Sequence, residues 1–226
     1  MCYSAESSIK NYAIGIAPLI PLFIYGDKYD KHFVFVIFFV IQMQLLEYFM
    51  WIDQKCGIIN KIATITANFQ LMLQPFFVLL GGYIFQTFNI LDNNLILIMS
   101  SYLLVSTIMM FYRYSKMDFQ KSICSKPDEN GNLIWYFVKK RLFKNPIIAH
   151  SLSTIPYLIF LIVPWFYLKD MKIGIFLILL FLISFVSHTL YYGNEKWQSL
   201  WCFFVTTMIY SYIVFRVLDE YTDILN

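Results

Sequence analysis

Residues 32–52 read HFVFVIFFVIQMQLLEYFMWI, an almost unbroken apolar run whose one carboxylate is Glu47 and which holds no lysine or arginine. A helix of about 20 residues, rising about 1.5 Å per residue, crosses the roughly 30 Å hydrocarbon core of a bilayer. A carboxylate inside such a helix is costly in lipid and is a functional candidate by default. This stretch therefore predicts a membrane-spanning helix with a polar site near its end.

The whole chain shares this apolar character. Hydrophobic residues make up 59% of its 226 residues and charged residues only 14%, whereas a typical soluble domain has about 25% charged residues. The mean hydropathy is +0.62. We therefore expect lipid, rather than water, to surround most of the surface. The net charge of only +3, with the basic residues concentrated in one loop, argues against nucleic-acid binding.

Further apolar stretches, separated by short polar breakers, resemble the first one. They predict an all-α integral membrane bundle of seven transmembrane helices, forming a single domain over residues 1–226. The bundle has six helices if the first stretch, which Lys10 and Asn11 shorten, does not span. The predicted spans are Ala5–Tyr25, His32–Ile52, Asn60–Gln86, Asn94–Tyr112, Pro146–Leu168, Lys172–Tyr191 and Trp197–Leu218.

A polar loop at residues 113–145 interrupts the apolar pattern. Its Asn130-Gly131 turn predicts a β-hairpin between Lys121–Ser125 and Asn132–Phe137. A basic and aromatic segment follows, in which each basic residue gains about 1 kcal/mol near anionic headgroups. The alternative is ordinary topology-setting charge beside a span. The candidate headgroup ligands are Lys139, Lys140, Arg141 and Lys144.

Orientation depends on charges and cysteines that favour opposite answers. We call the membrane face that holds the N-terminus the N-face. Most lysines and arginines map to its loops, so the positive-inside rule predicts a cytoplasmic N-terminus. The cysteines map there too, which suits disulfides on a lumenal or extracellular face, or free thiols or a soft-metal site in the cytoplasm. These cysteines are Cys2, Cys56, Cys124 and Cys202.

Polar residues inside the predicted spans recur at helical spacing. Gln44 and Glu47 share one helix face, and Glu47 lies roughly 8 Å from the end of its span. Similar stripes in later spans lie in the same half of the membrane, which predicts a one-leaflet polar pocket. For amides and hydroxyls the alternative is interhelical packing, and for the histidines it is contact with interfacial water. The candidate pocket residues are Glu47, Gln44, Gln70, Gln74, His150, His188 and Asn68.

Four short motifs resemble an uncharacterised family of multi-pass membrane proteins found in bacteria, algae and large DNA viruses. They are MCYSA at 1–5, QLLE at 44–47, LQP at 73–75 and WQSLWC at 197–202. Members of the family typically begin Met-Cys-Trp-Ser, whereas this chain has Tyr3 in place of the tryptophan. The resemblance implies a multi-pass architecture but no activity. The abundance of Ile, Asn, Lys and Phe also suits an AT-rich genome, viral or protist.

Three functions fit this pattern. The leading hypothesis is transport or conduction of a small ion, proton or polar solute, with Glu47 as the charged site. The second is a seven-helix sensor or interaction scaffold that docks a partner through the polar loop. The third is an intramembrane haem- or metal-dependent enzyme, although common hydrolase and phosphate-loop motifs are missing from the sequence. Its candidate ligands are His150, His188, Glu47 and Cys202. The cofactor, the oligomeric state and the membrane are left open.

Overall fold

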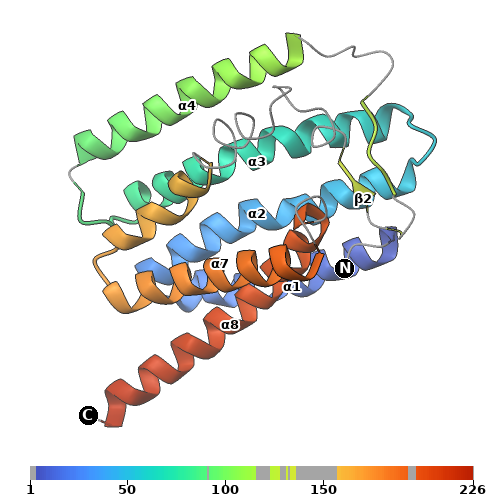
Figure 1. Ribbon diagram of the computed structural model, residues 1–226. Helices are drawn as coiled ribbons and strands as arrows, with labels where there is room; N and C mark the ends of the chain where they lie inside the picture. The colour runs from blue at the N-terminus through green and yellow to red at the C-terminus, as the bar shows by residue number, and fades with distance from the viewer. Residues whose placement is uncertain are drawn as a thin grey trace.

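The computed structural model describes residues 4–90, 92–115, 123–127, 131, 133–135, 157–192 and 197–225. Helices form nearly all of this part of the chain (Figure 1), so the predicted all-α class is confirmed. The long helices are α1 (Ala5–Tyr25), α2 (Lys28–Ile52), α3 (Ile58–Ile84), α4 (Asp92–Ser115), α7 (Met171–Tyr192) and α8 (Trp197–Leu225).

Among the described residues, α1, α2 and α3 are each long and apolar enough to cross a membrane. Shorter apolar helices cover Asn93–Met109, Tyr157–Tyr167 and Met171–Ile183. Helix α1 has the predicted bounds, and Ser4 caps it by accepting a hydrogen bond from the backbone N–H of Ser7. Sequence and structure therefore agree that these three helices could cross a membrane.

The span predicted over Pro146–Leu168 differs in its described part. The α-helix ends at residue 162 and continues as the 3-10 turn η1 (Val163–Tyr167). Pro164 lies in that turn and lacks the N–H that an α-helical hydrogen bond would require. Residues 146–156 lie outside the described part of the chain.

Helix α2 is the centre of the bundle, because α1, α3 and α8 all pack against it. Its apolar face buries Phe33, Ile37 and Ile41 in the main core. Figure 1 shows α4 along the α3 side of the bundle, and the C-terminal part of α8 extending beyond the other helices. The end of the bundle where α1 begins, α2 ends and α3 begins corresponds to the N-face, and we call it the N-face end.

A short hairpin lies at the N-face end (Figure 1). Strand β1 (Lys126–Pro127) pairs antiparallel with β2 (Leu133–Ile134), with Lys126 opposite Ile134. The first strand begins directly after the predicted segment Lys121–Ser125. The backbone of Ser125 bonds to the side chain of Asn60, so it is not free to extend the strand. The basic residues at 139–144 lie outside the described chain.

Candidate functional site

Five of the predicted pocket residues are described, and all five are buried in α2 and α3. They are Gln44, Glu47, Asn68, Gln70 and Gln74, none of them more than 6% exposed. Burial at this level removes each polar group from lipid and water alike, so each requires compensation from protein or ligand. We call these five buried polar side chains of the central helix pair the seam.

The amides of the seam connect separate elements. Gln44 of α2 donates to Oγ1 of Thr206 of α8 over 3.2 Å. Gln70 of α3 donates to the carbonyl of Phe39 of α2 over 2.5 Å. These bonds hold the three helices together, which is the packing role that the sequence left as an alternative.

Only the oxygen of the Gln74 side-chain amide has a hydrogen-bond partner among the described residues. The Tyr157 hydroxyl donates to its Oε1 over 2.5 Å. Its Nε2 is buried and has no hydrogen-bond partner within the described part of the chain. A buried donor without an acceptor costs about 1–3 kcal/mol. Gln74 therefore offers a donor to any acceptor that reaches the seam.

Glu47 is completely buried, with 0% of its surface exposed. Met43 and Met50 occupy the same face of α2, four residues before it and three after it. Both methionines belong to a buried cluster with Ala63, Ala67, Leu133 and Trp135. Holding a charge at such a position in a membrane costs about 2.5 kcal/mol or more. A proton, a cation or neighbouring donors must offset that cost.

The sequence analysis did not single out His32, a fully buried histidine at the start of α2. Its Nε2 lies 2.9 Å from the carbonyl of Val78, which can only accept, so Nε2 carries the proton. Burial favours the neutral ring, in which Nδ1 then accepts from Oγ1 of Thr87 over 2.8 Å. The ring stacks on Trp165 at 5.0 Å between centroids. His32 is thus neutral with one fixed tautomer, and it ties α2 to α3 and to the segments that follow α3 and precede α7.

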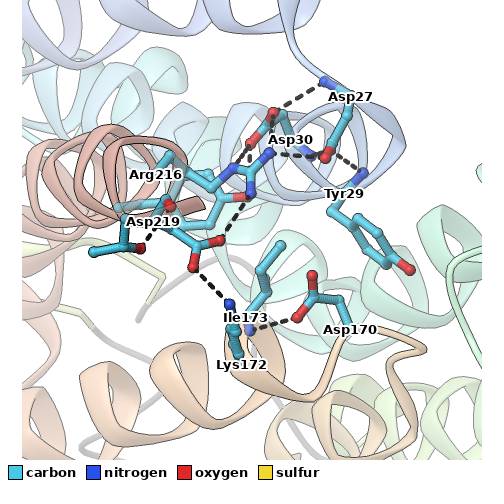
Figure 2. A network of polar contacts seen from close by, with 10 residues as sticks. Asp27, Tyr29, Asp30, Asp170, Lys172, Ile173, Arg216 and Asp219 are labelled. Atoms are coloured by element: carbon cyan, nitrogen blue, oxygen red, sulfur yellow. Dashed lines mark hydrogen bonds and ion pairs between the residues drawn. The ribbon is translucent and has the colours of Figure 1, made fainter. Parts of the chain in front are cut away.

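Figure 2 shows a charged network around Arg216 and Asp30. Asp30 lies near the start of α2, whereas Glu47 lies near its other end. Arg216 of α8 donates from Nε to Oδ1 of Asp30 over 2.8 Å and from Nη2 to Oδ2 of Asp27 over 2.7 Å. The Tyr212 hydroxyl also donates to Oδ1 of Asp30 over 2.8 Å. Asp219 adds a contact of 3.7 Å to Arg216 and pairs with Lys172 of α7 at 3.2 Å. The network joins the starts of α2 and α7 to α8.

Buried polar residues are therefore not confined to one end of α2. Glu47 lies near the N-face end, whereas Asp30 and His32 are buried near the other end. The sequence predicted polar side chains concentrated in one leaflet. It did not anticipate the second set, whose members pair with residues far away in the chain.

A second cluster of hydrogen-bonded polar groups lies at the N-face end. The Asn60 side chain donates to the carbonyls of Met50 and Ser125, both over 2.9 Å, and accepts from the Ser125 N–H over 2.9 Å. The hydroxyls of Ser125 and Thr64 lie 2.8 Å apart. Because these bonds join α2, α3 and the segment before β1, they hold that segment against the bundle.

Among the four candidate cysteines, Cys56 and Cys124 form a disulfide. Cys56 lies in the turn between α2 and α3, and Cys124 directly precedes Ser125. Cys2 lies outside the described residues, and the Cys202 side chain is not described either.

Asp53 ends α2 and supports the start of α3. Its Oδ1 accepts from the Gly57 N–H over 3.0 Å and its Oδ2 from the Asn60 N–H over 3.1 Å. Both bonds stabilise the charged carboxylate, and the bond from Asn60 contributes most. They therefore hold the pKa of Asp53 below its ordinary value.

The remaining candidates cannot be placed. His150 lies outside the described residues, and the side chain of His188 in α7 is not described. No group of three or more His, Cys, Asp or Glu side chains that could hold a metal occurs in the described part of the chain. Of the candidate metal ligands, only Glu47 has a described side chain.

Comparison of this chain with family models, curated proteins and solved structures found no match.

Proposed function

We propose that the protein is a multi-pass membrane protein that conducts or transports a small ion, proton or polar solute, with Glu47 as its charged site. The observation that carries the proposal is the complete burial of Glu47 on the central helix α2, one turn from Gln44. An acid inside a membrane-spanning helix is a functional candidate by default, and ion and proton pathways are among the sites where such acids occur.

The amides beyond Glu47 support a path along the seam. Gln44 and Gln74 present polar atoms to the interior of the bundle, and Nε2 of Gln74 has no acceptor among the described residues. A passing solute or water molecule gives that donor a partner. Gln70 differs because its amide is bonded to the backbone of α2. We therefore assign Gln70 to packing and Gln74 to the path.

Exposed apolar side chains support the proposed seven-span arrangement. On α4 they include Leu97, Leu104, Ile108 and Phe111, and on α8 Val214, Val217 and Leu218. Apolar surfaces this extensive suit lipid and are unfavourable in water. We propose that α4, the helix around residue 160, α7 and α8 span the membrane together with α1, α2 and α3.

We further propose that the N-face lies in an oxidising compartment. The disulfide between Cys56 and Cys124 supports this orientation, because stable disulfides are rare in the cytosol. The distribution of basic residues predicted the reverse, and most of that bias came from one loop. An epitope tag at the N-terminus tests it: antibody access in intact cells supports the proposal, and access only after permeabilisation contradicts it.

Flux into proteoliposomes tests the function. The purified protein is reconstituted and assayed for H⁺, Na⁺, K⁺ and Cl⁻ movement beside Glu47→Gln and a matched control, Glu6→Gln. Glu6 is also an acid on a helix but is exposed. We expect roughly tenfold lower flux for Glu47→Gln and unchanged flux for Glu6→Gln. Equal flux in all three proteins removes Glu47 from the path, and flux no greater than in empty liposomes removes transport of these ions.

A further inference from the structure

The loop segment that carries the hairpin is buried to an unusual degree. We call residues 123–127 and 133–135 the cap. Within it the side chains of Ile123, Ser125, Leu133 and Trp135 are all at most 3% exposed. Loops usually run over the surface, with exposed side chains and few fixed contacts. The cap is instead inserted into the N-face end of the bundle.

The cap covers the part of α2 that carries Glu47. Leu133 and Trp135 pack in one cluster with Met43 and Met50. Since these two methionines flank Glu47 on the same helix face, the cap residues lie over that face. Ala63 and Ala67 of α3 complete the cluster, and their small side chains leave room for the tryptophan. Movement from the N-face to Glu47 therefore meets the cap first.

Two different kinds of bond hold the cap in place. The Asn60 side chain binds both the N–H and the carbonyl of Ser125. The disulfide between Cys56 and Cys124 fixes the adjacent residue to the α2–α3 turn. Both cysteines are only half-buried, so a dithiol can approach them. The polar bonds can break and re-form within the protein, whereas the covalent bond needs a chemical reaction.

We propose that the cap is a plug over the N-face entrance to Glu47, and that the thiol–disulfide state of Cys56 and Cys124 controls how readily it opens. This inference rests on the proposed function, because it assigns a gate to the same site. With the disulfide formed, the cap cannot move away from the α2–α3 turn. Once the disulfide is reduced, the described contacts that still hold the cap are the Asn60 bonds, the contact between the Ser125 and Thr64 hydroxyls, and the apolar cluster.

The opening reaction is thiol–disulfide exchange with a dithiol. One thiolate of the dithiol attacks a sulfur of the Cys56–Cys124 bond and forms a mixed disulfide. The second thiol of the reductant then displaces that link. Two electrons pass from the dithiol, which becomes a disulfide, to the cysteine pair, which is released as two thiols after proton uptake.

Carboxyl labelling tests the plug without any assay of transport. The full-length protein, with Cys2→Ser and Cys202→Ser so that reduction acts on one pair only, is treated with a water-soluble carbodiimide and glycine ethyl ester. Mass spectrometry then measures modification at each acid, before and after dithiothreitol. We expect labelling of Glu47 to rise at least about tenfold on reduction, because the loop constraint is lost. The exposed acid Glu6 is the internal control and should not change.

Two further variants keep the test decisive. Cys56→Ser/Cys124→Ser should label at Glu47 with or without dithiothreitol, and Asn60→Ala should raise labelling less while the disulfide is intact. Circular dichroism and gel filtration confirm that each variant is folded. Unchanged Glu47 labelling in the reduced protein and in the folded cysteine double variant overturns the plug. If labelling rises but no flux occurs in any state, the transport function fails and the plug over Glu47 stands. If flux depends on Glu47 but labelling of Glu47 is unchanged, the plug is overturned and the transport function stands.

Discussion

Arg216 of α8 and Asp30 of α2 are joined by a charged hydrogen bond of 2.8 Å, although the two residues are 186 positions apart in the chain. Both side chains are well shielded, with 12% of Arg216 and 5% of Asp30 exposed. The pair lies at the end of the bundle opposite Glu47, next to Asp27 and Asp219. Arg216 is therefore the shared cationic partner of three carboxylates, whereas Asp30 is one of several partners of Arg216.

This asymmetry predicts unequal effects of removing the two partners. Arg216→Met should lower the free energy of unfolding by about 3–5 kcal/mol, because it leaves the buried carboxylate of Asp30 without its cationic partner. Asp30→Asn should cost clearly less, since Arg216 keeps Asp27 and Asp219. Thermal unfolding in detergent, followed by circular dichroism, measures both. Equal losses for the two variants would contradict the shared role of Arg216.

His32 and Gly81 should be energetically coupled. A Cβ atom added at Gly81 would lie 2.4 Å from Cδ2 of His32, a ring that two hydrogen bonds hold in place. We expect Gly81→Ala to cost about 1–3 kcal/mol through this overlap. In a His32→Ala background the same substitution should cost much less, because the ring is gone. A double-mutant cycle by thermal unfolding measures the coupling, and strictly additive effects would show that the overlap is relieved elsewhere.

The pKa of Asp53 predicts a pH-dependent contribution to stability. The folded state lowers this pKa, so the contribution is fully present above the ordinary aspartate pKa and disappears as pH falls through the lowered value. Asp53→Asn should therefore be less stable than the wild type near neutral pH, and the difference should shrink below about pH 4. Melting temperatures of both proteins between pH 3 and 7 provide the measurement. A difference that is constant over this range would exclude the carboxylate as its origin.

The helices were predictable from the sequence because the signal for each lies within its own residues. Helix α1 has the predicted bounds. Helix α3 begins at Ile58, two residues before the predicted Asn60, because Asp53 binds backbone N–H groups at its start. Partners across the bundle were not predictable in this way. His32 with Val78 and Asn60 with Ser125 are 46 and 65 residues apart, and no periodicity links them. Such pairs follow from helix packing.

The two buried glutamines of α3 should separate stability from transport. Gln70 donates to backbone carbonyls of α2, so Gln70→Met leaves those acceptors without this donor and should cost about 1–3 kcal/mol. Gln74 has an unpartnered Nε2 in the described part of the chain, so losing that donor removes no bond. Its Oε1 does accept from Tyr157, and Gln74→Met is therefore combined with Tyr157→Phe to avoid leaving a buried hydroxyl.

The combined Gln74→Met/Tyr157→Phe variant should be nearly as stable as the wild type, because both members of the bond are removed together. Its flux in proteoliposomes should nevertheless fall, since the free amide donor has left the path. Gln70→Met should show the reverse, with a lower melting temperature and flux per folded molecule unchanged. Should the Gln74 variant retain full flux while Gln70→Met loses it, the two assignments would be reversed, with Gln70 in the path and Gln74 a packing residue.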